Sequence, residues 1–309
     1  MTRITSHEHA AFLRDTFASD QAVALIGLGK NAGKTTVLNA LIHAHRNAAR
    51  SLVLTSIGYD GESYDLVAGH QKPLVYLFPG MAAITAQQFL KQASIDPEIL
   101  ACFAGDTLFG PPVFAKAKQA GFVVIAGPSS LQDLIAIRAR IREEDPGALF
   151  VVDGALGRKR GATADYADGS VLCVSAAFGA PHELAEKVEH ALYAMTLPLA
   201  KAGEGTRLYG AITDRVVTSF LNETQYKQGP LVIDDRAACF ISSQMRRALA
   251  RRGVELKAWQ GASVRALVFN PRLAGGQLAP LEPYVASLAQ KTDLPLLVLD
   301  AEPAIGKAL

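Results

Sequence analysis

Residues 27–36 of the chain read Gly-Leu-Gly-Lys-Asn-Ala-Gly-Lys-Thr-Thr, a glycine-rich stretch followed by a lysine and two hydroxyl side chains. Small residues let backbone N–H groups converge on phosphate oxygens, and the start of a helix adds partial positive charge. In such a loop Lys34 reaches the outer phosphates of a nucleotide, and the Thr35 hydroxyl binds Mg²⁺. We therefore expect ATP and Mg²⁺ as cofactors. The expected phosphate contacts are Gly29, Lys30, Asn31, Ala32, Gly33, Lys34, Thr35 and Thr36.

The stretch departs from the usual GxxxxGK[ST] spacing at one position. The first glycine of that pattern falls on Leu28, although Gly27 and Gly29 stand on either side of it. The alternative interpretation is a glycine-rich turn between a strand and a helix that contains Gly-Lys-Thr by accident. The apolar run before the loop and the helical pattern after it favour the phosphate-binding interpretation.

A carboxylate that could share the metal follows another apolar run. Residues 148–153 read Ala-Leu-Phe-Val-Val-Asp, so Asp153 ends a predicted strand. In open α/β folds, ligands bind beyond the carboxyl ends of the strands, which places Asp153 at the expected nucleotide edge. We expect it to bind Mg²⁺ together with Thr35; the alternative is an aspartate that only caps a turn.

Two further groups of residues on the same expected edge keep two interpretations each. The basic run 158–160, Arg-Lys-Arg, either binds a second anion or is an ordinary solvated surface. The stretch 127–130, Gly-Pro-Ser-Ser, either binds an anion or caps the following helix, and capping is the better-supported interpretation because serine is a preferred N-cap residue.

Short apolar runs alternate with segments of helical periodicity along the first 200 residues. Nearly continuous apolar strands that alternate with helices are typical of a parallel sheet covered on both faces. We therefore expect an α/β fold with a doubly wound, mostly parallel sheet and helices on both of its faces. The predicted strands are 22–28, 52–57, 74–78, 122–126, 148–152 and 171–175, and the predicted helices are 33–46, 131–144 and 182–195.

The last third of the chain is less regular. We expect residues 1–200 to form the nucleotide-binding core and residues 201–309 to form a C-terminal α/β extension. The extension either continues the same sheet or makes a small second lobe. Its predicted strands are 208–212, 215–220, 263–269 and 294–299, and its predicted helix is 240–252.

Composition narrows the functional class. The 309 residues include 31 basic and 29 acidic side chains, and this even balance argues against a nucleic-acid partner. The three cysteines are far apart and have no zinc-ligand spacing, and no segment has the apolar length of a membrane span. The sequence thus predicts a cytoplasmic protein whose partner is a protein or a small molecule.

The stretch 30–36, Lys-Asn-Ala-Gly-Lys-Thr-Thr, resembles the P-loop NTPases that include dethiobiotin synthetases, ParA/MinD-type ATPases and molybdopterin-guanine-dinucleotide accessory proteins. In these families a carboxylate after the second strand lies near Mg²⁺ or the attacking water, which implies a catalytic role for Asp60 or Glu62 beside Lys34; an ordinary turn is the alternative. A late-strand asparagine contacts the base in several of them, which implies that role for Asn270. Lys30 is comparable to the signature lysine of the ParA/MinD group, although it stands one position closer to Lys34; the alternative is a loop lysine that faces solvent or touches a phosphate.

Three stretches together resemble the family of ATPase subunits of lysine aminomutase reactivases: 55–62 with Lys72-Pro73, 121–129 and 152–158. This resemblance implies an ATP-hydrolysing accessory factor that acts on a partner protein and reactivates a cobalamin-dependent aminomutase. A homodimer is also compatible with it. The alternative functions are an ATP-dependent ligase or small-molecule kinase similar to dethiobiotin synthetase, and a nucleotide-binding scaffold without catalysis.

Overall fold

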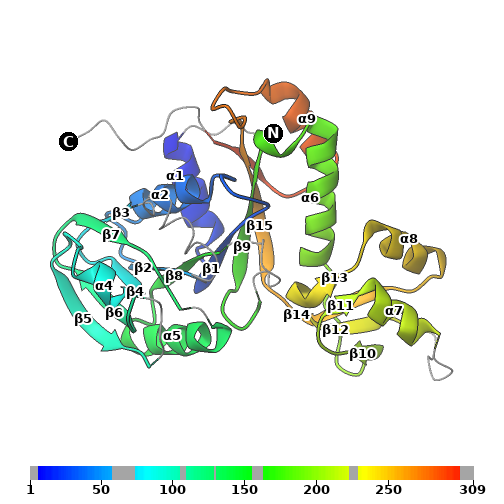
Figure 1. The fold of residues 1–309 in the computed structure, drawn as a ribbon, viewed down its shortest axis with the longest axis horizontal. Coiled ribbons are helices and arrows are strands. Elements are labelled where there is room, and N and C mark those ends of the chain that lie inside the picture. Colours follow the sequence, from blue (N-terminus) through cyan, green and yellow to red (C-terminus); the bar gives the residue numbers. More distant parts are fainter. Residues whose placement is uncertain are drawn as a thin grey trace.

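A computed structural model of the chain describes residues 6–57, 74–104, 109–128, 130–154, 163–222 and 229–299. Within these ranges no helix combines the length and the apolar character that crossing a bilayer requires. A large sheet runs through the middle of the molecule, and a smaller lobe lies beside one of its ends (Figure 1).

The large sheet has nine strands, and the pairs from β16 to β4 are all parallel. At the far edge, β6 is antiparallel to both of its neighbours. The strand β1 lies near the middle of the sheet, between β9 and β8. In order across the sheet the strands are β16 (Leu296–Val298), β15 (Ser263–Asn270), β9 (Gly169–Ser175), β1 (Ala22–Gly27), β8 (Leu149–Asp153), β2 (Leu52–Ser56), β4 (Ala82–Ala86), β6 (Pro112–Ala117) and β5 (Pro97–Cys102).

Helices cover both faces of this sheet. Successive residues of β1 point to opposite faces, so Val23 and Leu25 pack in one core while Ala24 and Ile26 pack in the other. The first core includes α1 (Ser6–Thr16) and α2 (Lys34–Ala44). The second core includes α5 (Leu131–Glu144), α6 (Pro181–Met195) and α9 (Leu281–Ala289). The predicted α/β class with a large, mostly parallel sheet is confirmed.

Two predicted strands of the parallel sheet lie elsewhere. The runs 74–78 and 122–126 form β3 (Leu74–Leu77) and β7 (Gly121–Val124), which pair antiparallel with each other in a separate ribbon. Val75 and Val123 are buried, whereas Leu74 and Phe122 on the other face are 53% and 42% exposed. A ribbon with one exposed face cannot replace a central parallel strand, which is buried on both faces.

The chain beyond residue 200 divides between two sheets. A small lobe contains the parallel sheet β10 (Thr206–Leu208), β12 (Leu231–Asp235) and β14 (Leu256–Gln260), and the short pair β11 (Ile212–Thr213) and β13 (Cys239–Phe240). The chain then returns to the large sheet through β15 and β16. The remaining helices are α4 (Gln87–Leu90), α7 (Asp214–Leu221), α8 (Ser243–Arg251) and the 3₁₀ turns η1 (Ala176–Phe178) and η2 (Arg236–Ala238).

The predicted strand at 215–220 is wrong, because this segment is the helix α7. Its β-branched valines favour a strand locally. However, Thr213 caps the helix by accepting a hydrogen bond from the Val216 N–H. The apolar residues Val216, Val217, Phe220 and Leu221 recur at helical spacing and pack in the core of the lobe.

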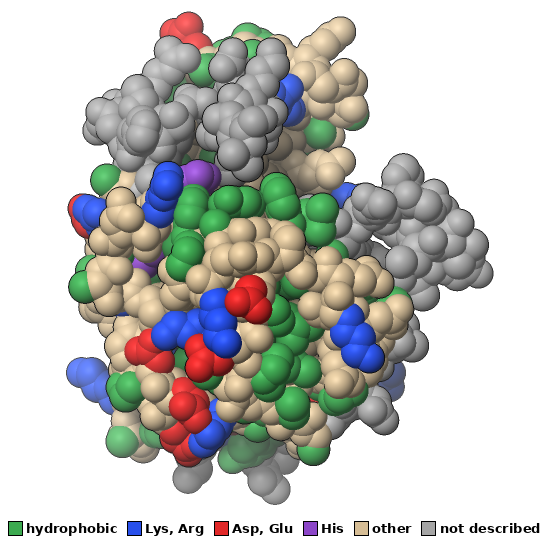
Figure 2. All heavy atoms as spheres, turned by 90° about the vertical axis from the view of Figure 1, so that its left-hand side faces the viewer, with side chains coloured by type: hydrophobic (Ala, Val, Ile, Leu, Met, Phe, Trp, Pro, Cys, Tyr) green, Lys and Arg blue, Asp and Glu red, His purple; other side chains and the backbone are tan. Residues whose placement is uncertain are grey.

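The side of the molecule that carries β5, β6 and α4 has a mixed surface. Figure 2 shows basic and acidic side chains next to one another on this face, with hydrophobic side chains between them. Charges of both signs are thus mixed on the described part of this face, in keeping with the even overall charge.

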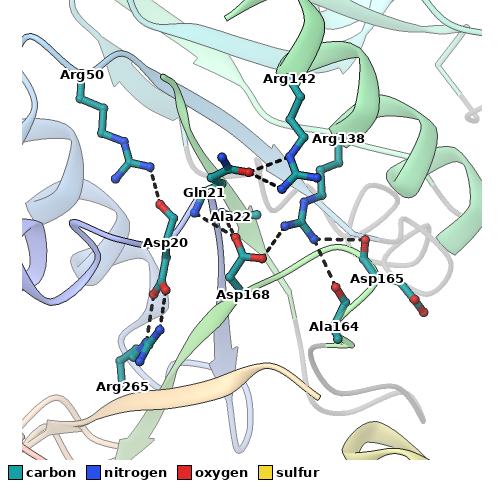
Figure 3. Close-up of polar contacts among 10 residues, drawn as sticks. All are labelled: Asp20, Gln21, Ala22, Arg50, Arg138, Arg142, Ala164, Asp165, Asp168 and Arg265. Carbon is teal, nitrogen blue, oxygen red and sulfur yellow. Dashed lines mark hydrogen bonds and ion pairs between the residues drawn. The ribbon is translucent and has the colours of Figure 1, made fainter. Parts of the chain in front are cut away.

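An ionic network ties the elements together at the end of the sheet where β1 begins (Figure 3). Both carboxylate oxygens of the buried Asp20 accept hydrogen bonds from Arg265 on β15. Asp168, just before β9, accepts the backbone N–H groups of Gln21 and Ala22, each at 2.9 Å, and forms an ion pair with Arg138 of α5. The network therefore ties the starts of β1 and β9 to the middle of α5 and to Arg265 near the start of β15.

The substitution Asp168→Asn should destabilise the protein by roughly 2–4 kcal/mol at pH 7, because it leaves the buried Arg138 cation without its carboxylate. Burial opposes ionisation of Asp168, but the hydrogen bonds from Arg138, Ala22 and Gln21 outweigh it and hold its pKa below the usual value. This contribution is complete above the unfolded-state pKa of about 3.9 and is lost as pH falls through the lower folded-state pKa.

Urea denaturation of wild type and variant between pH 7 and pH 2 measures this effect. The stability difference should be constant near neutrality and should shrink below about pH 4. The control is Asp234→Asn, which removes the exposed pair between Arg207 and Asp234 and should cost less than about 1 kcal/mol. Equal costs for the two substitutions would contradict the role assigned to Asp168.

Candidate functional site

The glycine-rich loop lies where the carboxyl ends of three neighbouring strands meet. The last residue of β1, Gly27, is in register with Cys173 of β9, and Leu25 is in register with Asp153 of β8. The Leu28 N–H donates to the Cys173 carbonyl at 3.0 Å, which extends the pairing by one residue before the chain turns into the loop. The parallel sheet thereby places the loop and Asp153 on the same edge.

Two residues in the left-handed region of backbone conformation shape the loop. Asn31 has φ of 62° and Gly33 has φ of 102°, and Gly33 is the N-cap residue of α2. Gly33 provides no side-chain cap, and the first turn of α2 contains no acidic residue. The first backbone N–H groups of a helix have no acceptor within the helix. The loop therefore ends at a helix N-terminus suited to an anion.

Lys34, the first residue of α2, folds back over the end of β1. A Cβ atom built on Gly27 would lie 3.1 Å from the Lys34 Nζ and 3.0 Å from the Ala32 Cβ. The ammonium group and the strand end are therefore in close contact across the loop. The lysine charge thus lies at the glycine-rich loop, and its contact with a phosphate stays a prediction.

The unusual Leu28 has a structural explanation. Its side chain is half-buried and packs against the second core, on the side of the sheet with α5, α6 and α9. The close approaches in this part of the loop occur at the glycines beside it. A Cβ atom on Gly29 would lie 3.0 Å from the Phe178 ring, and Gly27 is equally tight against Ala32. The glycines at 27 and 29 thus fulfil the steric requirement, and Leu28 anchors the loop.

Asp153 ends β8 directly beside β1. It is half-buried, and in the sheet it is in register with Ser56 of β2 on its other side. Its carbonyl accepts the Ile57 N–H at 3.0 Å, and the next residue, Gly154, donates to the Leu25 carbonyl at 3.1 Å. The backbone around Asp153 is thus held on both sides, which fixes the origin of its side chain at the loop edge.

Lys34 and Asp153 both influence the pKa of the buried Cys173 thiol. Burial raises its pKa to about 12, with a lowering contribution from Lys34 and a raising contribution from Asp153. Both charges therefore act on the same buried point at the end of β9. The thiol itself stays protonated at neutral pH, so Cys173 packs as a small apolar residue and does not serve as nucleophile or metal ligand.

The oxygen donors at this edge suit Mg²⁺. The Thr35 hydroxyl on the first turn of α2 and the Asp153 carboxylate at the end of β8 are hard oxygen ligands. Across the described residues there is no group of three or more His, Cys, Asp or Glu side chains that could hold a metal alone. Mg²⁺ commonly binds through one or two protein oxygens, waters and substrate phosphates, so this donor set fits it.

The remaining predicted residues have different outcomes. Lys30 and Thr36 are exposed on the loop and on the first turn of α2. Asn270 reaches the loop itself, because its side-chain amide donates to the Asn31 carbonyl.

Ser130 accepts the Asp133 N–H at 3.0 Å, which confirms its helix-capping role. The predicted residues Asp60 and Glu62 and the basic run 158–160 lie outside the described residues.

Two hydroxyl side chains on β2 and β4 have contacts that were not predicted. Ser56 accepts the Gly127 N–H at 3.0 Å, and Thr85 accepts the Ala126 N–H at 3.2 Å. A Cβ atom on Gly127 would lie 1.9 Å from the Ser56 carbonyl oxygen, so this position requires glycine. These contacts bring the chain before α5 against β2 and β4. Only the glycine-proline pair at 127–128 signals this arrangement in the sequence.

No protein-family model, no curated protein and no solved structure matches this chain.

Proposed function

We propose that this chain binds a nucleoside triphosphate, ATP, at the loop 27–36 and hydrolyses it with the help of Mg²⁺. The observation that carries the proposal is the position of Lys34. Its ammonium group folds back over the loop at a helix N-terminus, and the carboxylate of Asp153 ends the adjacent strand. A lysine, a helix N-terminus and a carboxylate on one sheet edge are among the components that phosphoryl transfer uses.

Each residue has a separate task in this proposal. The backbone N–H groups from Gly29 to Thr36 bind the phosphate oxygens, and Lys34 neutralises charge on the outer phosphates. Thr35 and Asp153 hold the metal. Mg²⁺ supplies charge neutralisation on the β- and γ-phosphates. Positioning of the attacking water by Asp60 or Glu62 remains part of the proposal that rests on sequence alone.

The sequence resemblance suggests what the hydrolysis serves. We propose an accessory factor whose nucleotide cycle acts on a partner protein, with a cobalamin-dependent aminomutase as the client class. The chemistry of the loop supports the ATPase step, whereas the client rests on the resemblance of residues 55–62, 121–129 and 152–158.

Phosphate release by the purified protein with ATP and Mg²⁺ tests this proposal. We expect slow basal turnover that depends on Mg²⁺ and rises when a client aminomutase is added. Turnover that requires a small carboxylate acceptor, with the phosphoryl group found on that acceptor, would instead establish a ligase or kinase. Absence of both ATP binding and turnover would overturn the proposal.

A further inference from the structure

The side chain of Asn270 holds the loop from the far end of the chain. Asn270 is the last residue of β15, where it is in register with Ser175 of β9. Its Nδ2 donates to the Asn31 carbonyl at 3.0 Å, and its Oδ1 accepts the Arg272 N–H at 3.1 Å. Both hydrogen bonds require this orientation of the amide. In the flipped orientation Oδ1 would face the Asn31 carbonyl and Nδ2 would face the Arg272 N–H, so neither bond could form.

The hydrogen bond to the Asn31 carbonyl lies at a residue of the loop with an unusual backbone conformation. Asn31 is in the left-handed region, with φ of 62°, an uncommon conformation for a residue with a side chain. The peptide bond after it is planar and trans, so the Ala32 N–H points opposite to the Asn31 carbonyl. When Asn270 binds that carbonyl, the Ala32 N–H is turned away from β15.

We propose that Asn270 is a positioning residue that orients the Ala32 N–H for a phosphate oxygen. This inference rests on the proposed nucleotide site and deepens it. It assigns a task in that site to the C-terminal third of the chain. It differs from the base-contacting role that the sequence resemblance implies, since here each end of the Asn270 amide bonds to a backbone group.

Packing around the loop supports a positioning role. A Cβ atom on Gly33 would lie 2.6 Å from Leu299 Cδ1 and 3.3 Å from the Asn270 Cβ. The far side of the loop is bounded by Phe178, whose ring contacts Gly29. The loop is therefore confined between side chains of the β15 and β16 ends and a side chain that follows β9.

The test compares MgATP with inorganic tripolyphosphate, a ligand that has phosphates but no base. Wild type, Asn270→Asp and Asn270→Ala are titrated calorimetrically with each ligand in the presence of Mg²⁺. We expect both variants to lose about tenfold in affinity, and by the same factor for the two ligands, because one hydrogen bond to the loop is lost. Asn270→Asp should lose at least as much as Asn270→Ala, since it places a carboxylate against the Asn31 carbonyl.

A matched control separates positioning from general destabilisation. Gln119 donates from Nε2 to the Ser94 carbonyl, also at 3.0 Å, in a turn beside β7. Gln119→Glu makes the same amide-to-carboxylate change at a similar bond outside the nucleotide site. We expect it to leave both affinities within twofold of wild type. Thermal unfolding of all variants checks that each is folded. If Asn270→Asp does not fold, the comparison uses Asn270→Ala alone.

The possible outcomes are distinct. If the variants bind ATP more weakly but bind tripolyphosphate like wild type, Asn270 contacts the base and the inference is overturned while the nucleotide site stands. Unchanged affinity for both ligands also overturns it. If wild type binds neither ligand, the proposed function fails, and the inference fails with it.

Discussion

The variant Lys34→Met should hydrolyse ATP at least a hundredfold more slowly than wild type. The ammonium group lies against the end of β1 and across the loop. In the proposed function it stabilises negative charge on the transferred phosphate. Removal of a single preorganised charge or donor of this kind typically costs a factor of 10² to 10³ in turnover, as in oxyanion holes, so this estimate of about a hundredfold is conservative. Steady-state phosphate release at saturating MgATP measures the effect.

The control for Lys34→Met is Lys118→Met, which removes the same charge from an exposed position beyond β6. Its turnover should stay within twofold of wild type. Because the side chain of methionine is similar in length to the lysine stem, Lys34→Met should unfold at nearly the wild-type temperature. A folded Lys34→Met protein with wild-type turnover would show that hydrolysis takes place at some other site.

The variant Asp153→Asn should also hydrolyse ATP about a hundredfold more slowly, and its dependence on Mg²⁺ should change. An amide is a weaker ligand for Mg²⁺ than a carboxylate, so the Mg²⁺ concentration for half-maximal turnover should rise. The substitution conserves shape at a half-buried position, and the backbone there is held by bonds to Ile57 and Leu25, so the fold should persist. A Mg²⁺ titration of phosphate release, with both proteins at saturating ATP, measures both changes.

The matched control is Asp96→Asn, an exposed aspartate before β5 with φ of 44°. Asparagine tolerates this left-handed conformation as well as aspartate does, so the control should match wild type in turnover and in Mg²⁺ dependence. If Asp153→Asn also matches wild type in both, Asp153 is not a metal ligand, and the carboxylate only ends its strand.

The central strands were predictable because burial on both faces leaves a continuous apolar run. The runs at 22–28, 52–57, 148–152 and 171–175 correspond to β1, β2, β8 and β9. The edge of the sheet was not predictable by the same rule. β4 is rich in alanine, which has low strand propensity, and it joins β6 by antiparallel pairing. The ribbon of β3 and β7 has one exposed face, yet its sequence is as apolar as a central strand.

The candidate phosphate loop lies in one stretch of sequence and could be predicted, as could Asp153 at the end of an apolar run, whereas the contacts that distant segments make with the loop could not. The glycines, Lys34 and Thr35 follow one another, so their spacing alone indicates a phosphate-binding loop. Phe178 and Leu299 contact the loop only because the order and register of the strands bring their segments beside it. Asn270 is 239 positions from Asn31, and its hydrogen bond to that residue depends on the place of β15 in the sheet.

Hydrogen exchange of the backbone with and without MgATP tests the central claim most directly, because it locates the bound phosphates on the chain. If the loop binds the triphosphate, the amides of residues 29–36 should exchange more slowly when MgATP is present. The amides of Gln21 and Ala22, which bond to Asp168 at the opposite end of β1, should be unchanged. Saturating MgATP that leaves residues 29–36 unprotected, or that protects another part of the chain instead, would contradict the account.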